Sequence, residues 1–156
     1  LSWDPIPGAT GYAIYVVNDN GIDELLGEVI TNSFEAAPSA QYRIKAFTVL
    51  DNERVYGEAQ VVKTNIKKAS ISSLKSTSYR KVVVKYKKIT GVKTYEIKYK
   101  VSGKNWKTIK TTKLTRTIKN LTPGKRCYVK VRGVCNNGSK KIPGPWSATK
   151  SVIVSW

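Results

Sequence analysis

Apolar and polar residues alternate along most of this 156-residue chain, and this period of two is the feature that most limits its fold. Successive side chains of a β-strand point to opposite faces of a sheet, so short alternating runs indicate strands with one buried face. No stretch keeps apolar residues at the i, i+3, i+4 and i+7 spacing of an amphipathic helix for three turns. We therefore expect an all-β protein.

The expected strands are short, and turn sequences rich in Gly, Asn and Pro separate them. One such turn, Asn20-Gly21, is typical of a tight hairpin because both residue types accept positive φ angles. Many short strands with this spacing favour a two-sheet β-sandwich over a barrel or a parallel α/β fold. The strands are expected at residues 11–17, 24–29, 42–46, 60–62, 82–86, 95–99, 106–109, 115–118, 127–131 and 151–154.

The two halves of the chain repeat each other. Residues 1–14 align with residues 84–97 at an offset of 83, and every core-type position stays in step. Residues 42–46 align with residues 127–131 at an offset of 85, a shift of two residues that a loop can absorb. A repeat of this length made of short strands predicts two β-sandwiches in tandem.

The distribution of charge also divides the chain into two halves, with the boundary near residue 64. Residues 1–64 hold 4 basic and 9 acidic side chains, whereas residues 65–156 hold 24 basic side chains and a single acid, Glu96. The total of +18 thus combines about −5 and about +23. We expect two domains, a mildly acidic one at 1–64 and a strongly basic one at 65–156, joined by a short connection.

Three segments resemble the fibronectin type III family. The segment from Trp3-Asp4 through Gly8-Ala9 to Tyr15 resembles its strands B and C. Residues 121–133 resemble its E–F corner and strand F, and Gly144-Pro145-Trp146-Ser147 is similar to the start of strand G. The resemblance covers essentially the whole chain and implies two consecutive immunoglobulin-like β-sandwiches of fibronectin type III topology. The lysine-rich second half is also similar to repeats in secreted and wall-associated proteins of Gram-positive bacteria.

Two features depart from the family pattern. Family members begin with a strand A well before the strand B tryptophan, so we expect the first domain to lack its N-terminal strand and to leave a sheet edge open. Cys127 stands where the family usually has a corner tyrosine. We expect the loss of that hydroxyl to weaken the E–F corner unless Tyr128 or a water replaces it.

Catalytic chemistry finds little support in the sequence. The chain has no His, which excludes His-based triads, zinc sites of the His type and haem bound through imidazole. The basic half has one carboxylate and cannot hold a carboxylate pair for acid–base hydrolysis. Residues 18–24 have a weak likeness to a calcium loop but lack its spaced acids, so a plain hairpin turn is preferred. We expect no enzymatic activity, no cofactor and no metal.

The two cysteines are not expected to form a disulfide. Cys127 and Cys135 are eight residues apart, which on one strand corresponds to about 26 Å, far beyond the ~7 Å that a disulfide tolerates between Cα atoms. We interpret Cys127 as a small core residue and Cys135 as a partly exposed residue at the strand end. No His is present to activate either thiol.

Five residues are candidate surface contacts. In related receptor domains with a Trp-Ser motif before strand G, the tryptophan stacks on cations of strand F, and Lys130 and Arg132 have the outward parity to stack on Trp146 in this way. Such a stack is worth about 1 kcal/mol. Tyr15 and Val17 face outward from the first domain and could form a small sugar-stacking or interdomain patch, although scattered exposed apolar residues are common.

The expected function follows from the resemblance and the charge. The resemblance implies a non-catalytic spacer or accessory module of a larger secreted or cell-surface protein, beside a carbohydrate-active enzyme, a peptidase or an adhesin. The alternative is a binding module for an anionic wall polymer or glycan through the basic second domain. Lysines alternate over both faces of the strands, which argues against specific nucleic-acid recognition and leaves an evenly solvated basic surface as the plain alternative.

A third possibility is a receptor-like module that binds another protein through its loops. No apolar run is long enough to span a membrane.

Overall fold

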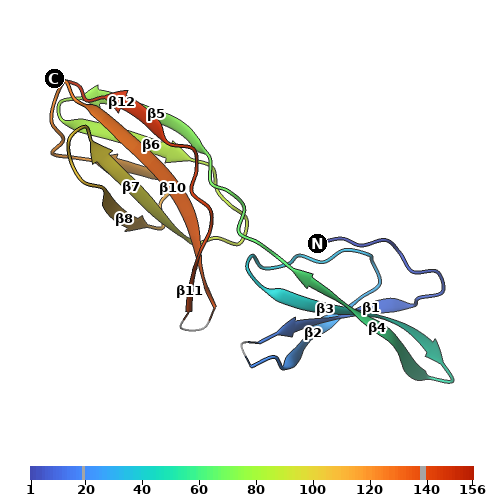
Figure 1. Ribbon diagram of the computed structural model, residues 1–156. Helices are drawn as coiled ribbons and strands as arrows, with labels where there is room; N and C mark the ends of the chain where they lie inside the picture. The colour runs from blue at the N-terminus through green and yellow to red at the C-terminus, as the bar shows by residue number, and fades with distance from the viewer. Residues whose placement is uncertain (19, 138–139) are drawn as a thin grey trace. The chain divides into compact units, whose positions relative to one another are not determined.

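The computed structural model describes residues 1–18, 20–137 and 140–156, and the fold over these residues is all-β, as expected. The chain divides into two compact units, Leu1–Asn65 (unit 1) and Ile66–Trp156 (unit 2). Figure 1 shows the strands of each unit. In the described part of the chain, no helix is long and apolar enough to cross a membrane.

Unit 1 is built on one antiparallel sheet of order β2-β1-β3-β4. Its strands are β1 (Gly11–Val17), β2 (Asp23–Val29), β3 (Gln41–Leu50) and β4 (Glu53–Lys63). One face carries a small core of Tyr12, Ile14, Tyr42 and Ile44, the alternate residues of β1 and β3. The β3–β4 hairpin is longer than the strands predicted at residues 42–46 and 60–62. The prediction missed the extra length because β4 is almost entirely exposed and shows no alternation of burial.

Unit 2 is a two-sheet sandwich. One sheet has the order β5-β6-β9, and the other has the order β11-β10-β7-β8 with β12 also paired to β10. A single core fills the space between the sheets and includes Val82, Val84, Ile97, Val129 and Val131, all fully buried. The strands are β5 (Ile71–Ser78), β6 (Lys81–Tyr86), β7 (Thr94–Val101), β8 (Lys107–Thr111), β9 (Thr115–Ile118), β10 (Arg126–Asn137), β11 (Lys140–Pro143) and β12 (Lys150–Ile153).

Two strands of unit 2 were absent from the sequence prediction. Strand β5 contains four serines in eight residues, so its alternation is weak, and Ile71 is its only buried residue. Strand β11 has four residues and pairs with the end of β10. Both strands are held by their neighbours in the sheet rather than by a hydrophobic pattern of their own.

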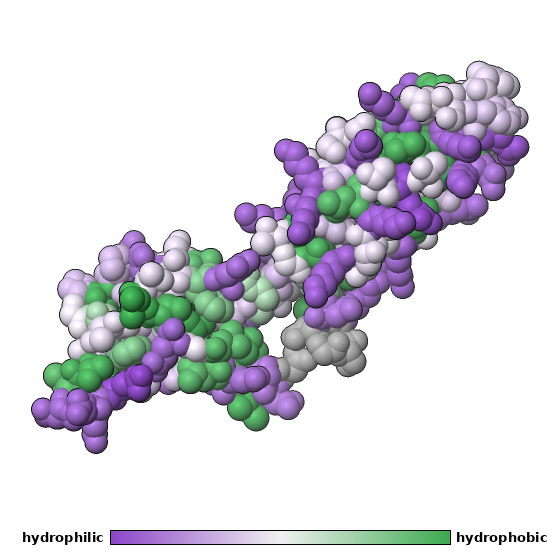
Figure 2. Space-filling view, turned by 180° about the vertical axis from the view of Figure 1, so that it is seen from behind, coloured by the Kyte–Doolittle hydropathy of each residue, from purple (hydrophilic) through white to green (hydrophobic). Residues whose placement is uncertain are grey.

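The second sheet is much reduced in unit 1. Over the described residues, the counterpart of the β6–β9 pair is a single bridge between Ser2 and Ser33, flanked by paired backbone hydrogen bonds between Leu1 and Phe34. Unit 1 exposes many large apolar side chains, and hydrophobic residues are visible over the surface of this unit in Figure 2. The exposed large apolar side chains are Ile6, Ile22, Leu25, Leu26, Ile30, Val49, Leu50, Val55, Tyr56 and Val61.

The internal repeat is visible in the hydrogen bonds of the two units. The amide N–H of Ile6 donates to the hydroxyl of Tyr12 at 2.8 Å, and the amide N–H of Ile89 donates to the hydroxyl of Tyr95 at the same distance. The same loops close through turns from Ala9 to Ile6 and from Val92 to Ile89, both at 3.1 Å.

Aromatic packing repeats as well. Trp3 packs edge-on against Tyr12 with 5.1 Å between ring centroids, and Tyr86 packs against Tyr95 at 5.0 Å. The sequence offset of 83 residues thus relates the same contact in both units.

The corners before β3 and β10 differ, as the sequence indicated. In unit 1 the hydroxyl of Tyr42 accepts a hydrogen bond from the amide of Ala37 at 2.8 Å, which is the geometry of a tyrosine corner. In unit 2 the aligned Cys127 is fully buried. The corner there is bonded instead by the guanidinium of Arg80, which donates to the carbonyl of Leu121 at 3.1 Å, and by the amide of Gly124, which donates to Val154 at 2.9 Å.

The tyrosine–loop hydrogen bond gives a first prediction. Tyr95→Phe removes the acceptor of the buried Ile89 amide, and an unpaired buried amide costs about 1–3 kcal/mol. Hydrogen exchange of the Ile89 amide should accelerate by about tenfold or more. Tyr79→Phe is the matched control, because Tyr79 is 60% exposed, and it should leave the rate unchanged. An unchanged rate in Tyr95→Phe would contradict the assignment.

Candidate functional site

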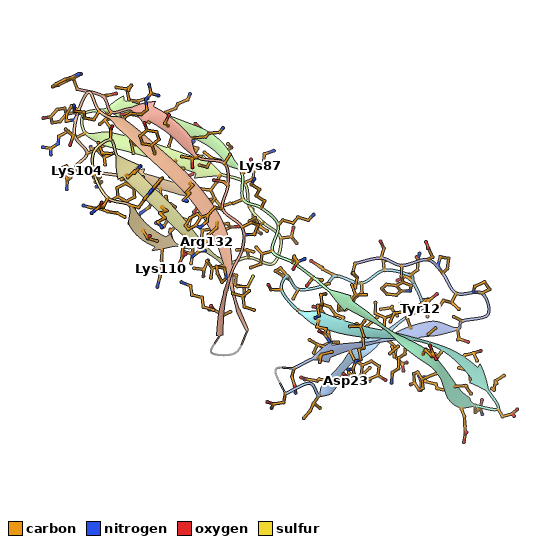
Figure 3. The ribbon with its side chains drawn as sticks, viewed as in Figure 1. Tyr12, Asp23, Lys87, Lys104, Lys110 and Arg132 are labelled. Atoms are coloured by element: carbon orange, nitrogen blue, oxygen red, sulfur yellow. The ribbon has the colours of Figure 1, made fainter. Side chains whose placement is uncertain are left out.

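The outer face of the β7–β10 pair collects the most distinctive side chains of unit 2. On β10, Tyr128, Lys130 and Arg132 point outward and alternate with the buried residues Cys127, Val129 and Val131. The antiparallel register places them opposite Lys100, Lys98 and Glu96 of β7. Cations therefore dominate this face. Figure 3 labels Arg132, which projects from β10.

Aromatic rings separate the cations. The guanidinium of Arg132 lies 4.4 Å from the ring centre of Trp146, and the ammonium of Lys130 lies 5.2 Å from the same ring. Lys130 is also 5.1 Å from the ring of Trp106. Lys100 lies 5.2 Å from Trp106 and 5.6 Å from Tyr128. We call these six residues the cation–aromatic ladder.

The serine that follows Trp146 fixes the tryptophan on the ladder. Ser147 is 7% exposed and makes two hydrogen bonds with Val131 of β10. Its amide donates to the Val131 carbonyl at 2.7 Å, and its hydroxyl accepts from the Val131 amide at 3.0 Å. Since Val131 lies between Lys130 and Arg132, the indole is held over both cations. Ser147 therefore anchors the backbone to β10, and Trp146 beside it stacks on the cations.

Glu96 ends the ladder with two ion pairs. Its carboxylate accepts hydrogen bonds from Arg132 at 2.7 and 2.8 Å and from Lys141 at 2.5 Å, although the side chain is only 6% exposed. Burial by itself raises the pKa of Glu96, but the hydrogen bonds from Lys141 and Arg132 outweigh burial and hold the pKa below its ordinary value. The single acid of unit 2 is therefore ionised and fully used.

The structure contains the stack of Trp146 on Lys130 and Arg132 that the sequence predicted. Sequence reasoning missed the ladder members Lys100, Trp106 and Tyr128 and their neighbour Glu96. A signal for Glu96 was present, because it is the only acid among 24 cations and has outward parity on its strand. The sequence predicted a strand at residues 106–109, but β8 begins at Lys107, so Trp106 lies before the strand and strand parity does not give its direction.

Tyr15 and Val17 lie in unit 1, on β1. Tyr15 is half-buried, and the ammonium of Lys45 lies 5.2 Å from its ring. Val17 ends the strand, where it is paired with Asp23 of β2 and Gln41 of β3. These residues form no part of the ladder, and their role as contacts with another molecule stays a prediction.

Burial disfavours the thiolate form of both cysteines. Burial raises the pKa of Cys127 to about 11, and burial also raises the pKa of Cys135. Both are free cysteines, as the sequence predicted, and both lie on β10. Over the part of the chain that the structure describes, no group of three or more His, Cys, Asp or Glu could hold a metal ion.

Replacing Trp146 by Leu tests the ladder. The substitution removes the ring that lies over Lys130 and Arg132, and we expect the free energy of unfolding of unit 2 to fall by about 1–2 kcal/mol. Chemical denaturation measures this change. Trp156→Leu, at an 84% exposed tryptophan, is the control and should change stability much less. Equal stability of Trp146→Leu and the wild-type chain would show that the stack of Trp146 on Lys130 and Arg132 does not stabilise unit 2.

Glu96 gives a prediction about pH. Because its pKa is lowered in the folded state, its contribution to stability is complete above its ordinary value of 4.5 and is lost as the pH falls through the lowered value. Glu96→Gln should cost about 2 kcal/mol at neutral pH and progressively less in acid, as the wild-type chain loses the ion pairs. Denaturation at neutral and acid pH provides the comparison. A difference between the two chains that is the same at every pH would contradict the ionised carboxylate.

Comparison with known proteins supports the fold. No family model and no curated protein matches the sequence. Among solved structures, the FN1-FN3 domains of chicken CNTN1 match 99% of this chain at 18% identity with a TM-score of 0.52. The alpha chain of the chicken interferon gamma receptor matches 99% of it at 13% identity with a TM-score of 0.51. A two-domain fibronectin type III segment of chicken tenascin matches 97% of it at 14% identity with a TM-score of 0.55.

This chain spans 59%, 89% and 87% of those three structures, respectively. Two of the three are described by their fibronectin domains, and the aligned regions cover both units of this chain. At such low identities the likeness concerns the fold alone. The all-β chain therefore has the fold of tandem fibronectin type III domains.

Proposed function

We propose that this chain is a non-catalytic accessory or spacer module of a larger extracellular protein. Its fold, shared with receptor and tenascin domains, is commonly used for such modules. The proposal rests on one observation: the acid, the thiols and the ladder aromatics of unit 2 are already engaged in contacts within the unit or are at least partly buried. The one acid of unit 2 is spent in ion pairs, both thiols have raised pKa values, and the ladder aromatics are stacked on cations.

The test compares the parent protein with and without residues 1–156. The proposal expects unchanged turnover of a small soluble substrate but weaker retention of the parent on the cell surface. Loss of turnover in the parent that carries Glu96→Gln, with folding intact, would contradict it. That result would place the only acid of unit 2 in catalysis.

A second function, attachment to an anionic polymer, is favoured by the charge of unit 2. This unit holds 24 cations and one acid, and both carboxylate oxygens of that acid are bonded to Arg132 and Lys141. No other carboxylate exists in unit 2 to neutralise the remaining cations. Figure 2 shows hydrophilic side chains spread over the visible face of unit 2. Such a surface attracts polyanions through long-range electrostatics.

Salt dependence provides the measurement. The chain should bind an immobilised acidic polysaccharide at about 50 mM salt and lose about tenfold or more in affinity by about 200 mM, because bound counterions are released on association. A neutral polysaccharide of the same length should not retain it. Failure to bind any polyanion at low ionic strength would reject this second function.

A further inference from the structure

Two adjoining hollows lie along one side of unit 2, between the edge strands β8 and β9. Their volumes are about 450 and 480 Å³, and both are lined by Tyr99 of β7 and Lys119 at the end of β9. Strand β8 ends one sheet of the sandwich and β9 ends the other. The hollows therefore lie where the two sheets open toward solvent, and we call them together the β8–β9 trough.

Cations reach the trough from several segments. Lys104 comes from the β7–β8 turn, Lys107 from β8, Lys113 from the β8–β9 connection, Arg116 from β9 and Lys119 from its end. All five side chains are exposed. Lys100 also lines the trough, but its ammonium is engaged with Trp106 and Tyr128. Since Glu96 is committed to Arg132 and Lys141, unit 2 has no further acid to pair with the five.

The floor and one rim of the trough are not cationic. The half-buried ring of Tyr99 lines both hollows, and the side chains of Asn105, Asn120 and Thr122 line the first. An aromatic ring can pack against the apolar face of a sugar, and amide and hydroxyl groups can bond its hydroxyls. Phosphate or sulfate alone would require only the cations.

The connection that carries Lys113 is held in place. The hydroxyl of Tyr86 donates to the Lys113 carbonyl at 2.5 Å, and the Tyr86 amide donates to the Leu114 carbonyl at 3.1 Å. The amide of Lys113 donates to the hydroxyl of Thr111 at 3.1 Å. The backbone is thus fixed before any ligand arrives, which reduces the entropy lost on binding.

We propose that the β8–β9 trough binds an acidic oligosaccharide, with Lys104, Lys107, Lys113, Arg116 and Lys119 facing its anionic groups and Tyr99, Asn105 and Asn120 contacting the sugar rings and hydroxyls. This inference rests on the proposed attachment to anionic polymers and assigns it a site and a ligand class. Lysines on edge strands also prevent strands of different molecules from pairing, and the experiment distinguishes that role.

The probe is a heparin-derived hexasaccharide, titrated into the whole chain by calorimetry over a range of salt concentrations. The trough variant is Lys104→Gln/Lys113→Gln/Lys119→Gln. The matched control is Lys75→Gln/Lys87→Gln/Lys150→Gln, with the same change of charge at exposed residues that do not line the trough. Lys104 and Lys87 lie at opposite margins of unit 2 in Figure 3.

At physiological salt the trough variant should lose about tenfold or more in affinity, and its salt slope should fall by about one for each contacting lysine removed. The control should lose less than about threefold. Asn120→Gly keeps the φ of +58° accessible and removes the whole uncharged side chain, so it should weaken binding with an unchanged salt slope. This variant avoids any loss of core packing at Tyr99.

Each other result rejects a defined part of the account. Equal losses in the trough and control variants would show diffuse attraction, so the site would fall while attachment to polyanions stood. Self-association of the trough variant would show that these lysines guard the strand edges. Equal or tighter binding of a single-stranded DNA of matched charge, unaffected by Asn120→Gly, would reject the sugar ligand. No binding by the wild-type chain at low salt would reject attachment to polyanions itself.

Discussion

The hydrogen bond from a loop amide to a core tyrosine is the constraint on which both units depend. In each unit a buried strand carries the tyrosine, Tyr12 or Tyr95, and its hydroxyl accepts from an isoleucine amide six residues earlier, at 2.8 Å. In unit 2 the bond is buried and satisfies a backbone amide that would otherwise lack a partner, and in unit 1 the equivalent bond is partly buried. It also fixes the approach of the chain to the sheet, and the same tyrosine packs on the preceding aromatic residue.

Most of the fold could be predicted from the sequence, because buried strand faces leave an alternating pattern. The expected strands at residues 11–17 and 115–118 coincide with β1 and β9. The pattern failed where burial does not alternate: β4 is almost wholly exposed, and β5 is rich in serine. The stack of Trp146 on Lys130 and Arg132 was predictable because strand parity and a local motif placed all three. Trp106 and the β8–β9 trough were not, since they depend on turns and on two edge strands brought together only by the sandwich.

The two units share inward residues and differ in outward ones. Tyr12, Ile14 and Ile44 have counterparts in Tyr95, Ile97 and Val129, and all six are buried. The outward residues at equivalent places, Tyr15 and Val17 in unit 1 and Lys98 and Lys100 in unit 2, have no chemistry in common. The inward set supplies the buried apolar area that drives folding, and the ladder and the ion pairs of Glu96 add smaller contributions on the outer face of unit 2. The outward cations of unit 2 that neither stack on a ladder aromatic nor pair with Glu96 repel one another, and they add no buried apolar area to the fold.

The most direct test of this division is the free energy of unfolding of unit 2 after its exposed lysines lose their charge. A variant with glutamine in place of Lys85, Lys88, Lys93, Lys107, Lys110 and Lys113 keeps every buried residue. Because none of the six belongs to the ladder or pairs with Glu96, the free energy of unfolding should stay within about 1 kcal/mol of the wild-type value or rise as repulsion is relieved. A loss of several kcal/mol would contradict this division, because it would show that exposed cations outside the ladder and the Glu96 ion pairs also hold the sandwich together.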